Sequence, residues 1–143
     1  MKLAIIDFNR TIYDPETGAL TPGALDALDF LIQKGFTLVL ISKKEEGRDT
    51  KLVELGISNY FAEAMFVEKK TPELFNEILN KYGVLPAETV VLGDHVHSEI
   101  SAGNAVGAKT IRFRSGKFKD LEPRKGDEPT YTITQLNEIA ELL

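Results

Sequence analysis

The sequence predicts a three-layer α/β fold, in which helices cover both faces of a parallel sheet. Two observations support this prediction. Short, continuous apolar runs such as FTLVLI (residues 36–41) have the composition of strands that are buried on both faces. Helical stretches bounded by Pro and Gly separate these runs along the chain, and such alternation of strands and helices is typical of parallel sheets.

Five apolar runs are expected to form the strands of this sheet. In chain order they are residues 3–6, 36–41, 64–67, 89–92 and 110–113. The third and fifth runs are less apolar and are predicted to form weaker strands of the same kind. A further strand is predicted at the edge of the sheet over residues 131–133.

Four helical stretches lie between the strands. The first is predicted to open at Pro22, with Thr21 as its N-cap, and to close at Gly35. The others are expected over residues 47–55, 72–82 and 98–106, and a last helix over residues 135–143. Residues 115–129 contain two prolines, two glycines and many charges, and this composition predicts a surface loop.

Composition restricts the class of protein. A chain of 143 residues fits one domain, which we place at residues 1–143. The absence of Cys excludes disulfides, thiolate metal sites and Cys nucleophiles. Lys and Arg total 17 against 22 Asp and Glu, a balance that argues against a nucleic-acid binder. No apolar run is long enough for a signal peptide or a membrane span, so we expect a cytoplasmic protein without membrane partners.

Polar residues follow the predicted strands at the points where ligands are expected. In parallel α/β sheets, ligands bind outside the carboxyl ends of the strands. Asp7 and Ser42 come directly after apolar runs, Asp94 follows the Gly that ends a third run, and Lys69 lies shortly after a fourth. The sequence therefore predicts that these side chains meet at one edge of the sheet.

In this order, the residues resemble the four motifs of the haloacid dehalogenase (HAD) superfamily. The segment DFNRT (residues 7–11) resembles the DxDxT nucleophile loop, and Ser42 the Ser/Thr strand end. Lys69 matches the family lysine, while Asp94 and Glu99 match the acidic GDxxxxD loop. One such motif alone is a weak signal, but four in order at matching strand ends are a strong one. The resemblance covers essentially the whole chain and implies a Rossmann-like HAD core.

The resemblance implies a Mg²⁺-dependent phosphatase or phosphotransferase. Asp7 would attack phosphorus to form an aspartyl-phosphate, which water then hydrolyses. Mg²⁺ would be bound by Asp7, by the backbone carbonyl of Asn9 and by Asp94. Glu99, one methylene longer than the usual Asp, would hold the metal through water or orient Lys69.

The resemblance also implies a set of phosphate-binding groups. The Ser42 hydroxyl, the Lys43 backbone amide and Thr11 would surround the phosphoryl group, and Arg10 replaces the usual Gly with a cation at the mouth of the site. Lys69 is preferred to Lys70 as the motif lysine, because its spacing to Phe75 fits K-x-x-P-x-x-F.

His95 and His97 form an H-x-H pattern that raises the question of a second metal site. The sequence contains no other His and no Cys to complete a ligand set. We interpret the two histidines as exposed loop residues near the substrate entrance.

Asn9 departs from the family pattern at a position that matters for turnover. A second Asp usually stands there, protonates the leaving group and then activates water. An amide cannot do this, and the loss of general acid–base catalysis is worth roughly 10²–10⁴-fold in rate. Two functions remain open: a slow or specialised phosphatase, which we favour, or a phosphate-binding regulatory protein that has largely lost turnover.

The spacing of the motifs leaves no room for a cap domain. One helix fills each gap between Asp7, Ser42 and Lys69, whereas an inserted domain needs roughly 50 residues. Residues 13–20, with Asp14-Pro15 and Gly18, are predicted to form a hairpin-like flap. A capless, open site suits a large or macromolecular substrate, or closure by a second subunit of a homo-oligomer. The expected partner is a phosphorylated small molecule or a phosphorylated macromolecule.

Overall fold

A six-stranded parallel sheet forms the centre of the computed structural model, which describes residues 1–143. Its strand order is β5-β4-β1-β6-β7-β8, and every neighbouring pair is parallel. All six predicted strands are confirmed: β1 (Lys2–Asp7), β4 (Phe36–Lys43), β5 (Glu63–Val67), β6 (Thr89–Gly93), β7 (Lys109–Phe113) and β8 (Tyr131–Ile133). The predicted flap is a two-stranded hairpin, β2 (Tyr13–Asp14) and β3 (Ala19–Leu20).

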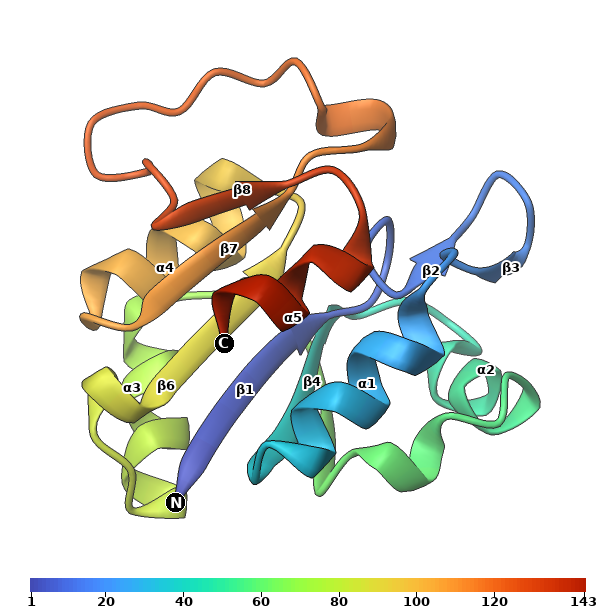
Figure 1. Ribbon diagram of the computed structural model, residues 1–143, viewed down its shortest axis with the longest axis horizontal. Coiled ribbons are helices and arrows are strands. Elements are labelled where there is room, and N and C mark those ends of the chain that lie inside the picture. The colour runs from blue at the N-terminus through green and yellow to red at the C-terminus, as the bar shows by residue number, and fades with distance from the viewer.

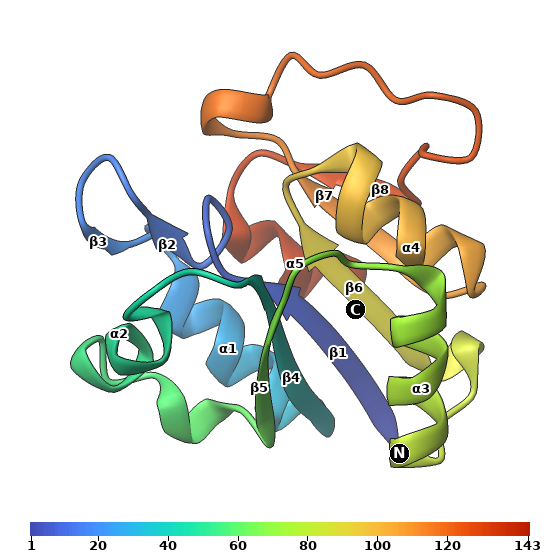
Figure 2. The same ribbon diagram turned by 180° about the vertical axis from the view of Figure 1, so that it is seen from behind.

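Helices cover both faces of this sheet, so the three-layer prediction is confirmed. The α-helices are α1 (Ala24–Gln33), α2 (Arg48–Glu54), α3 (Pro72–Tyr82), α4 (Ser101–Ala105) and α5 (Ile139–Leu142). Helices α1 and α5 lie on one face (Figure 1), and α3 and α4 lie on the other (Figure 2). No cap domain is inserted among the elements of the sheet. None of the helices combines the length and apolarity that a membrane crossing requires.

The buried side chains form two cores, one on each side of the sheet. Along β1, Ala4 and Ile6 pack toward α1, whereas Leu3 and Ile5 pack toward α3 and α4. Because both faces of the strand are covered, all four positions are apolar. This arrangement explains why the strands appear in the sequence as continuous apolar runs.

The start of α1 differs from the prediction. Thr21 is not its N-cap, because the helix begins at Ala24 and follows Gly23, whose φ of 84° is left-handed. A left-handed residue at the cap is readily adopted by Gly, and it turns the chain from the flap into the helix. The analogous prediction for α3 is confirmed: the Thr71 hydroxyl caps its first turn, and Gly83 ends it with a φ of 64°.

The helix predicted over residues 98–106 is divided into two parts. A π-helical turn over Val96–Ile100 precedes α4, and Ser98 within it has non-helical backbone angles. The Glu99 carboxylate accepts a hydrogen bond from the backbone N–H of His95 at 2.7 Å, which closes this turn. The last predicted helix is likewise shorter than expected, because a 3₁₀ turn over Leu136–Glu138 precedes α5.

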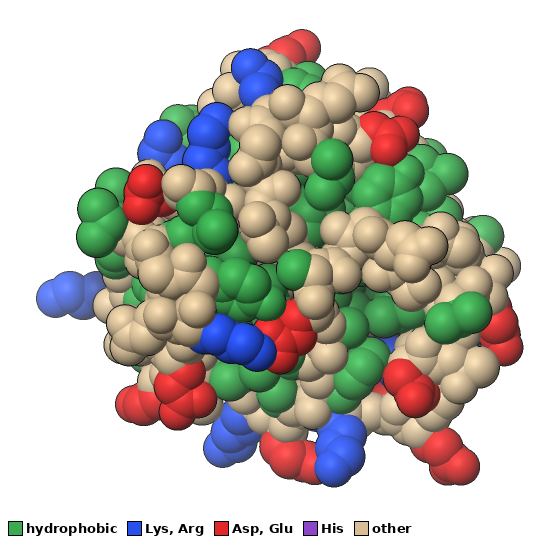
Figure 3. Space-filling model, turned by 90° about the horizontal axis from the view of Figure 1, so that it is seen from below, with side chains coloured by type: hydrophobic (Ala, Val, Ile, Leu, Met, Phe, Trp, Pro, Cys, Tyr) green, Lys and Arg blue, Asp and Glu red, His purple; other side chains and the backbone are tan.

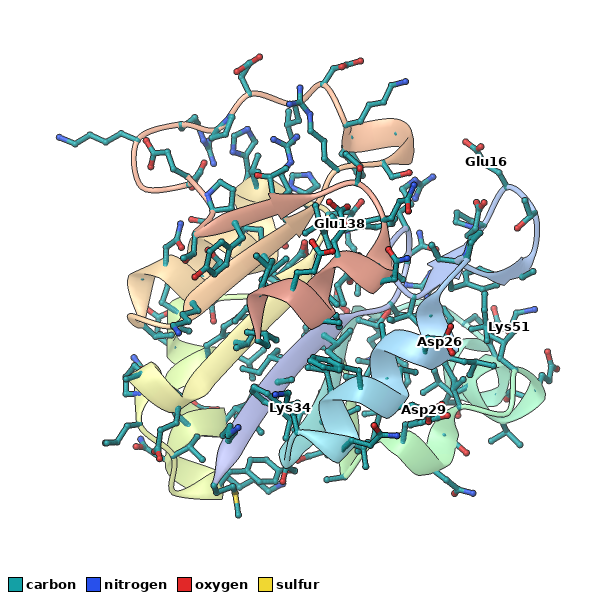
Figure 4. The ribbon with its side chains drawn as sticks, viewed as in Figure 1. Glu16, Asp26, Asp29, Lys34, Lys51 and Glu138 are labelled. Carbon is teal, nitrogen blue, oxygen red and sulfur yellow. The ribbon has the colours of Figure 1, made fainter.

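The two ends of the sheet have different surfaces. Figure 3 shows the end where the strands begin, with apolar side chains scattered among charged ones. Met1 and Leu85, which precede β1 and β6, are exposed. At the opposite end, the flap extends beyond the sheet with Glu16 at its outer tip (Figure 4). The Lys51 ammonium of α2 lies 5.6 Å from the Tyr13 ring at the base of this flap.

Candidate active site

A cavity of about 680 Å³ opens at the carboxyl ends of the strands. Most of the predicted site residues line it: Asp7, Asn9, Arg10, Lys43, Lys69, Asp94 and Glu99. The loop after β7 contributes Phe118, and His95 and His97 lie on the same wall. Ser42 and Thr11 do not line the cavity, because both are completely buried beneath it.

Three carboxylates meet at the floor of the cavity. Asp7, Asp94 and Glu99 are 6%, 4% and 2% exposed, and one oxygen of each lies within 4.8 Å of the others. Burial, together with the charge of Asp7, raises the pKa of both Asp94 and Glu99. Asp94 Oδ2 is buried without any hydrogen-bond partner. Clustered carboxylate oxygens with one unsatisfied acceptor are the donor set that a hard divalent cation such as Mg²⁺ prefers, so these residues fit the implied metal.

Lys70, rather than Lys69, is the lysine of this cluster. The Lys70 ammonium contacts Asp7 Oδ1 and lies 2.9 Å from Glu99 Oε1, with its side chain only 7% exposed. Burial alone would lower the pKa of Lys70, but the charges of Asp7 and Glu99 outweigh it and raise that pKa. Lys69 is exposed at the rim. Consecutive side chains outside a helix point in different directions. The spacing to Phe75 therefore selected Lys69, whereas its neighbour Lys70 is the one whose side chain reaches Asp7 and Glu99.

The loop after β1 holds Asp7 in place. The Thr11 hydroxyl donates to Asp7 Oδ2 at 3.3 Å, so both oxygens of Asp7 are engaged. The Phe8 carbonyl accepts the backbone N–H groups of Thr11, Ile12 and Tyr13 at 3.0–3.2 Å, which makes the turn tight. Thr11 was expected to contact substrate, but its buried position suits it to orient Asp7.

Arg10 is the one non-glycine residue with a positive φ, 61°. Its backbone N–H donates to the Tyr13 carbonyl at 2.7 Å, which fixes this left-handed conformation. Its side chain extends toward the loop after β7, with the guanidinium carbon 5.8 Å from the centre of the Phe118 ring. The nucleophile loop thus contacts a segment more than one hundred residues later in the chain.

The Ser42 hydroxyl is already engaged. It accepts a hydrogen bond from Arg48 Nη1 at 2.9 Å and donates to the Lys43 carbonyl at 3.3 Å. Arg48, the first residue of α2, also donates to the Lys43 carbonyl at 3.0 Å and pairs with Glu45. In this geometry Ser42 does not face the cavity, so its predicted contact with phosphate stays a prediction. Sequence reasoning missed Arg48, because no motif marks it.

The prediction that His95 and His97 are exposed loop residues is wrong. Both are part-buried and belong to the π-helical turn and its cap. The His95 ring lies 4.5 Å from the Phe118 ring, centre to centre, and burial lowers the pKa of His95. His97 Nδ1 lies 2.6 Å from Asp127 Oδ2. The two histidines therefore attach the loop after β7 to the wall of the cavity.

The loop over residues 114–130 crosses the top of the molecule in Figure 1 and is anchored along its length. Buried Arg112 donates to the carbonyls of Phe118, Lys119 and Leu121 at 2.9–3.3 Å. Burial opposes ionisation of Asp127, but hydrogen bonds from His97 and Arg124 lower its pKa to about 2. The loop is a surface element, as predicted, but these anchors were not visible in its sequence.

A family model with the description HAD-hydrolase-like matches residues 67–139, just over half of the chain. Together with the parallel core and the acidic site, this match establishes that the chain belongs to the HAD hydrolase family.

Two relatives and one solved structure are similar to this chain. The chain is 33% identical over 129 residues to a glyceraldehyde 3-phosphate phosphatase of Methanopyrus kandleri, covering 85% of this chain and 55% of the relative. It is 28% identical over 130 residues to a phosphoglycolate phosphatase of Vibrio parahaemolyticus, covering 87% and 56%. The magnesium-bound HAD hydrolase YfnB of Bacillus subtilis shares the fold, with a TM-score of 0.72, 23% identity and coverage of 87% and 57%. The chain thus spans about half the length of each of these proteins.

Proposed function

We propose that this chain is a Mg²⁺-dependent phosphatase that acts on phosphorylated small molecules through an aspartyl-phosphate on Asp7. The observation that carries the proposal is the meeting of Asp7, Asp94, Glu99 and Lys70 in one cavity. The names of the two relatives, both phosphatases of small phosphate esters, support the same reaction class.

The metal would be held by Asp7, by Asp94 and by the Asn9 carbonyl, with Glu99 close by. When bound, Mg²⁺ supplies positive charge that lets a carboxylate approach a phosphate dianion. The unpartnered Asp94 Oδ2 supports this role, because a buried acceptor without a donor is costly unless a cation satisfies it. Magnesium in the structure of YfnB supports the choice of ion.

The chain's own residues account for the two chemical steps. A carboxylate oxygen of Asp7 forms a bond to phosphorus while the ester P–O bond breaks, and the leaving oxygen takes a proton from water. Water then attacks phosphorus, the Asp7–phosphate bond breaks, and inorganic phosphate and a proton are released. Lys70 balances the charge of Asp7 and Glu99 throughout, while Thr11 keeps the nucleophile oriented.

Asn9 restricts which substrates react quickly. It offers no acidic proton, so acyl phosphates, whose carboxylate leaves without a proton, are favoured over alkyl phosphates, whose alkoxide needs one. The same residue favours one alternative, a phosphate-binding regulatory protein on the same fold. The variant Asn9→Asp separates the two: in a phosphatase it should accelerate glycerol 3-phosphate far more than acetyl phosphate, by up to roughly 10²-fold. Negligible rates for both proteins on both substrates would favour the regulatory protein.

The nucleophile is tested directly with acetyl phosphate and Mg²⁺. Asp7→Asn should abolish release of inorganic phosphate, because nucleophile and metal ligand are the same side chain. Asp49→Asn, which changes an exposed acid on α2 outside the cavity, is the matched control and should retain wild-type turnover. Circular dichroism verifies that both variants fold. Near-normal turnover in folded Asp7→Asn would refute the mechanism.

A further inference from the structure

Phe118 is the one large apolar side chain among the residues that line the active-site cavity. The other apolar residues of the lining, Val67, Pro72 and Ala102, are small, and the rest are polar or charged. Phe118 ends a 3₁₀ turn over Gly116–Phe118 and is only part-buried, so its ring contributes to the surface of the cavity. An aromatic ring in this position offers a contact to an apolar part of a ligand, because covering the ring removes apolar surface from water.

The Phe118 ring lies against both loops that carry the active-site carboxylates. Arg10, three residues after Asp7, has its guanidinium carbon 5.8 Å from the centre of the ring. The ring of His95, which follows Asp94, lies 4.5 Å from the Phe118 ring, centre to centre, with 55° between the two planes. The aromatic wall formed by Phe118 and His95 therefore adjoins the loops that would bind the phosphoryl group, and it faces the same cavity.

Arg112 holds the turn that carries Phe118. It lies on β7 opposite Gly93 and is 4% exposed. Its Nη2 atom donates to the carbonyls of Phe118 and Leu121 at 3.0 Å and 2.9 Å. Arg112 forms no salt bridge, and its Nε atom is buried without a hydrogen-bond partner. A buried guanidinium without a carboxylate partner is costly for folding, and the placement of Phe118 provides a reason to keep it.

Asn9 restricts the leaving group in a way that agrees with an aromatic wall. Its amide offers no acidic proton, so a fast-reacting leaving group must depart without one. Phenols are far more acidic than alkyl alcohols, with a pKa of about 10 for the phenol of tyrosine, so a phenolate departs more readily than an alkoxide. An aryl phosphate therefore fits both features: its oxygen departs without a proton, and its ring can pack against Phe118.

Building on the proposed phosphatase function, we propose that Phe118 is a specificity-determining residue that binds a planar aromatic leaving group, and that Arg112 is the positioning residue that holds it. The substrate is then an aryl phosphate. An Asp7 carboxylate oxygen forms a bond to phosphorus while the bond between phosphorus and the aryl oxygen breaks. The phenolate leaves with that electron pair along the aromatic wall.

Calorimetry with Mg²⁺ and three phosphonates tests the contact without turnover, because their P–C bond is not hydrolysed in this reaction. Benzylphosphonate carries a planar ring, cyclohexylmethylphosphonate a saturated ring of similar size, and methylphosphonate no ring. We expect benzylphosphonate to bind at least about tenfold more tightly than methylphosphonate, with cyclohexylmethylphosphonate between them. Equal affinities of the two ring compounds, or of all three probes, would overturn this proposal alone. If no probe binds, the phosphate site of the proposed function fails with it.

Variants then locate the contact. Phe118→Ala should weaken benzylphosphonate by about tenfold and methylphosphonate by at most about twofold, and Phe118→Leu should lie between wild type and Phe118→Ala. Leu121→Ala is the matched control, because it truncates another apolar side chain of the same loop that does not line the cavity, and it should change neither affinity. Equal losses for both ligands in folded Phe118→Ala would overturn the proposal.

A double-mutant cycle tests the role of Arg112. Arg112→Lys keeps a positive charge but cannot reproduce the contacts of a planar guanidinium with several carbonyls, so it should weaken benzylphosphonate by at least about threefold. In the Phe118→Ala background the same change should have little further effect, because Arg112 acts through Phe118. Additive losses in the double variant, or equal losses for benzylphosphonate and methylphosphonate, would overturn the positioning role.

Discussion

Replacing Lys70 with Met should destabilise the protein far more than the same change at Lys69. Lys70 is buried between Asp7 and Glu99. At 2.9 Å from Glu99 with an effective dielectric of ~20, the attraction between the two charges is about 6 kcal/mol. Met restores the volume but leaves buried carboxylates without a cation, a change that typically costs 3–5 kcal/mol. Protonation of Glu99 limits this loss, so we expect about 3 kcal/mol near neutral pH.

The measurement is urea-induced unfolding without Mg²⁺, followed by circular dichroism. Lys69→Met is the matched control and should lose less than about 0.5 kcal/mol, because Lys69 is exposed and forms no salt bridge. The raised pKa of Glu99 means that, in the Lys70 variant, the folded state is more stable when Glu99 is protonated than when it is charged. The deficit should therefore shrink at acidic pH and grow as pH rises. Equal losses at positions 69 and 70, or a deficit independent of pH, would refute the assignment of Lys70.

Three further outcomes test other parts of the site. Asp94→Ala should weaken Mg²⁺ binding in calorimetry by about tenfold or more; unchanged affinity would place the ion elsewhere. Gly93→Ala would put a Cβ atom 2.3 Å from Cγ of Glu99, so the Glu99 side chain must move. We expect the free energy of unfolding in urea to fall by about 1–3 kcal/mol. Wild-type stability would contradict the close approach. Asp127→Asn should cost about 1 kcal/mol at neutral pH. The pKa of Asp127 is about 2, below its ordinary value of 3.8, so its charged form stabilises the fold fully at pH values above 3.8. This stabilisation disappears as the pH falls toward 2. A difference from wild type that persists unchanged at about pH 2 would contradict the His97–Asp127 pairing.

Sequence reasoning worked best where one physical pattern had one structural outcome. The strands of the sheet are buried on both faces, so their apolar runs could be located directly, and Asp7 and Asp94 followed from their places at strand ends. The cap of α3 was predictable because Thr71 precedes Pro72, a residue favoured in the first turn.

It failed where two neighbouring residues could serve equally well, or where the partner lies far away in the sequence. Lys69 and Lys70 differ only in which way each side chain points, and only the folded chain decides that. Thr21 looked like a cap, but the turn from the flap required the left-handed Gly23. The contacts of Phe118 and Asp127 with the nucleophile loop and the histidines join segments that carry no common motif.

The position of β1 in the sheet has a consequence for how the protein is made. β1 pairs with β4 on one side and with β6 on the other, and its β6 partners are residues 89–92. During synthesis, one edge of β1 therefore lacks its strand until residues 89–92 have left the ribosome, and synthesis proceeds at about 5–20 residues per second. An apolar strand with an open edge is prone to pair with other chains. Chaperone dependence during expression, and a slow refolding phase that reports β1–β6 pairing, are the expected results of placing the nucleophile on this strand.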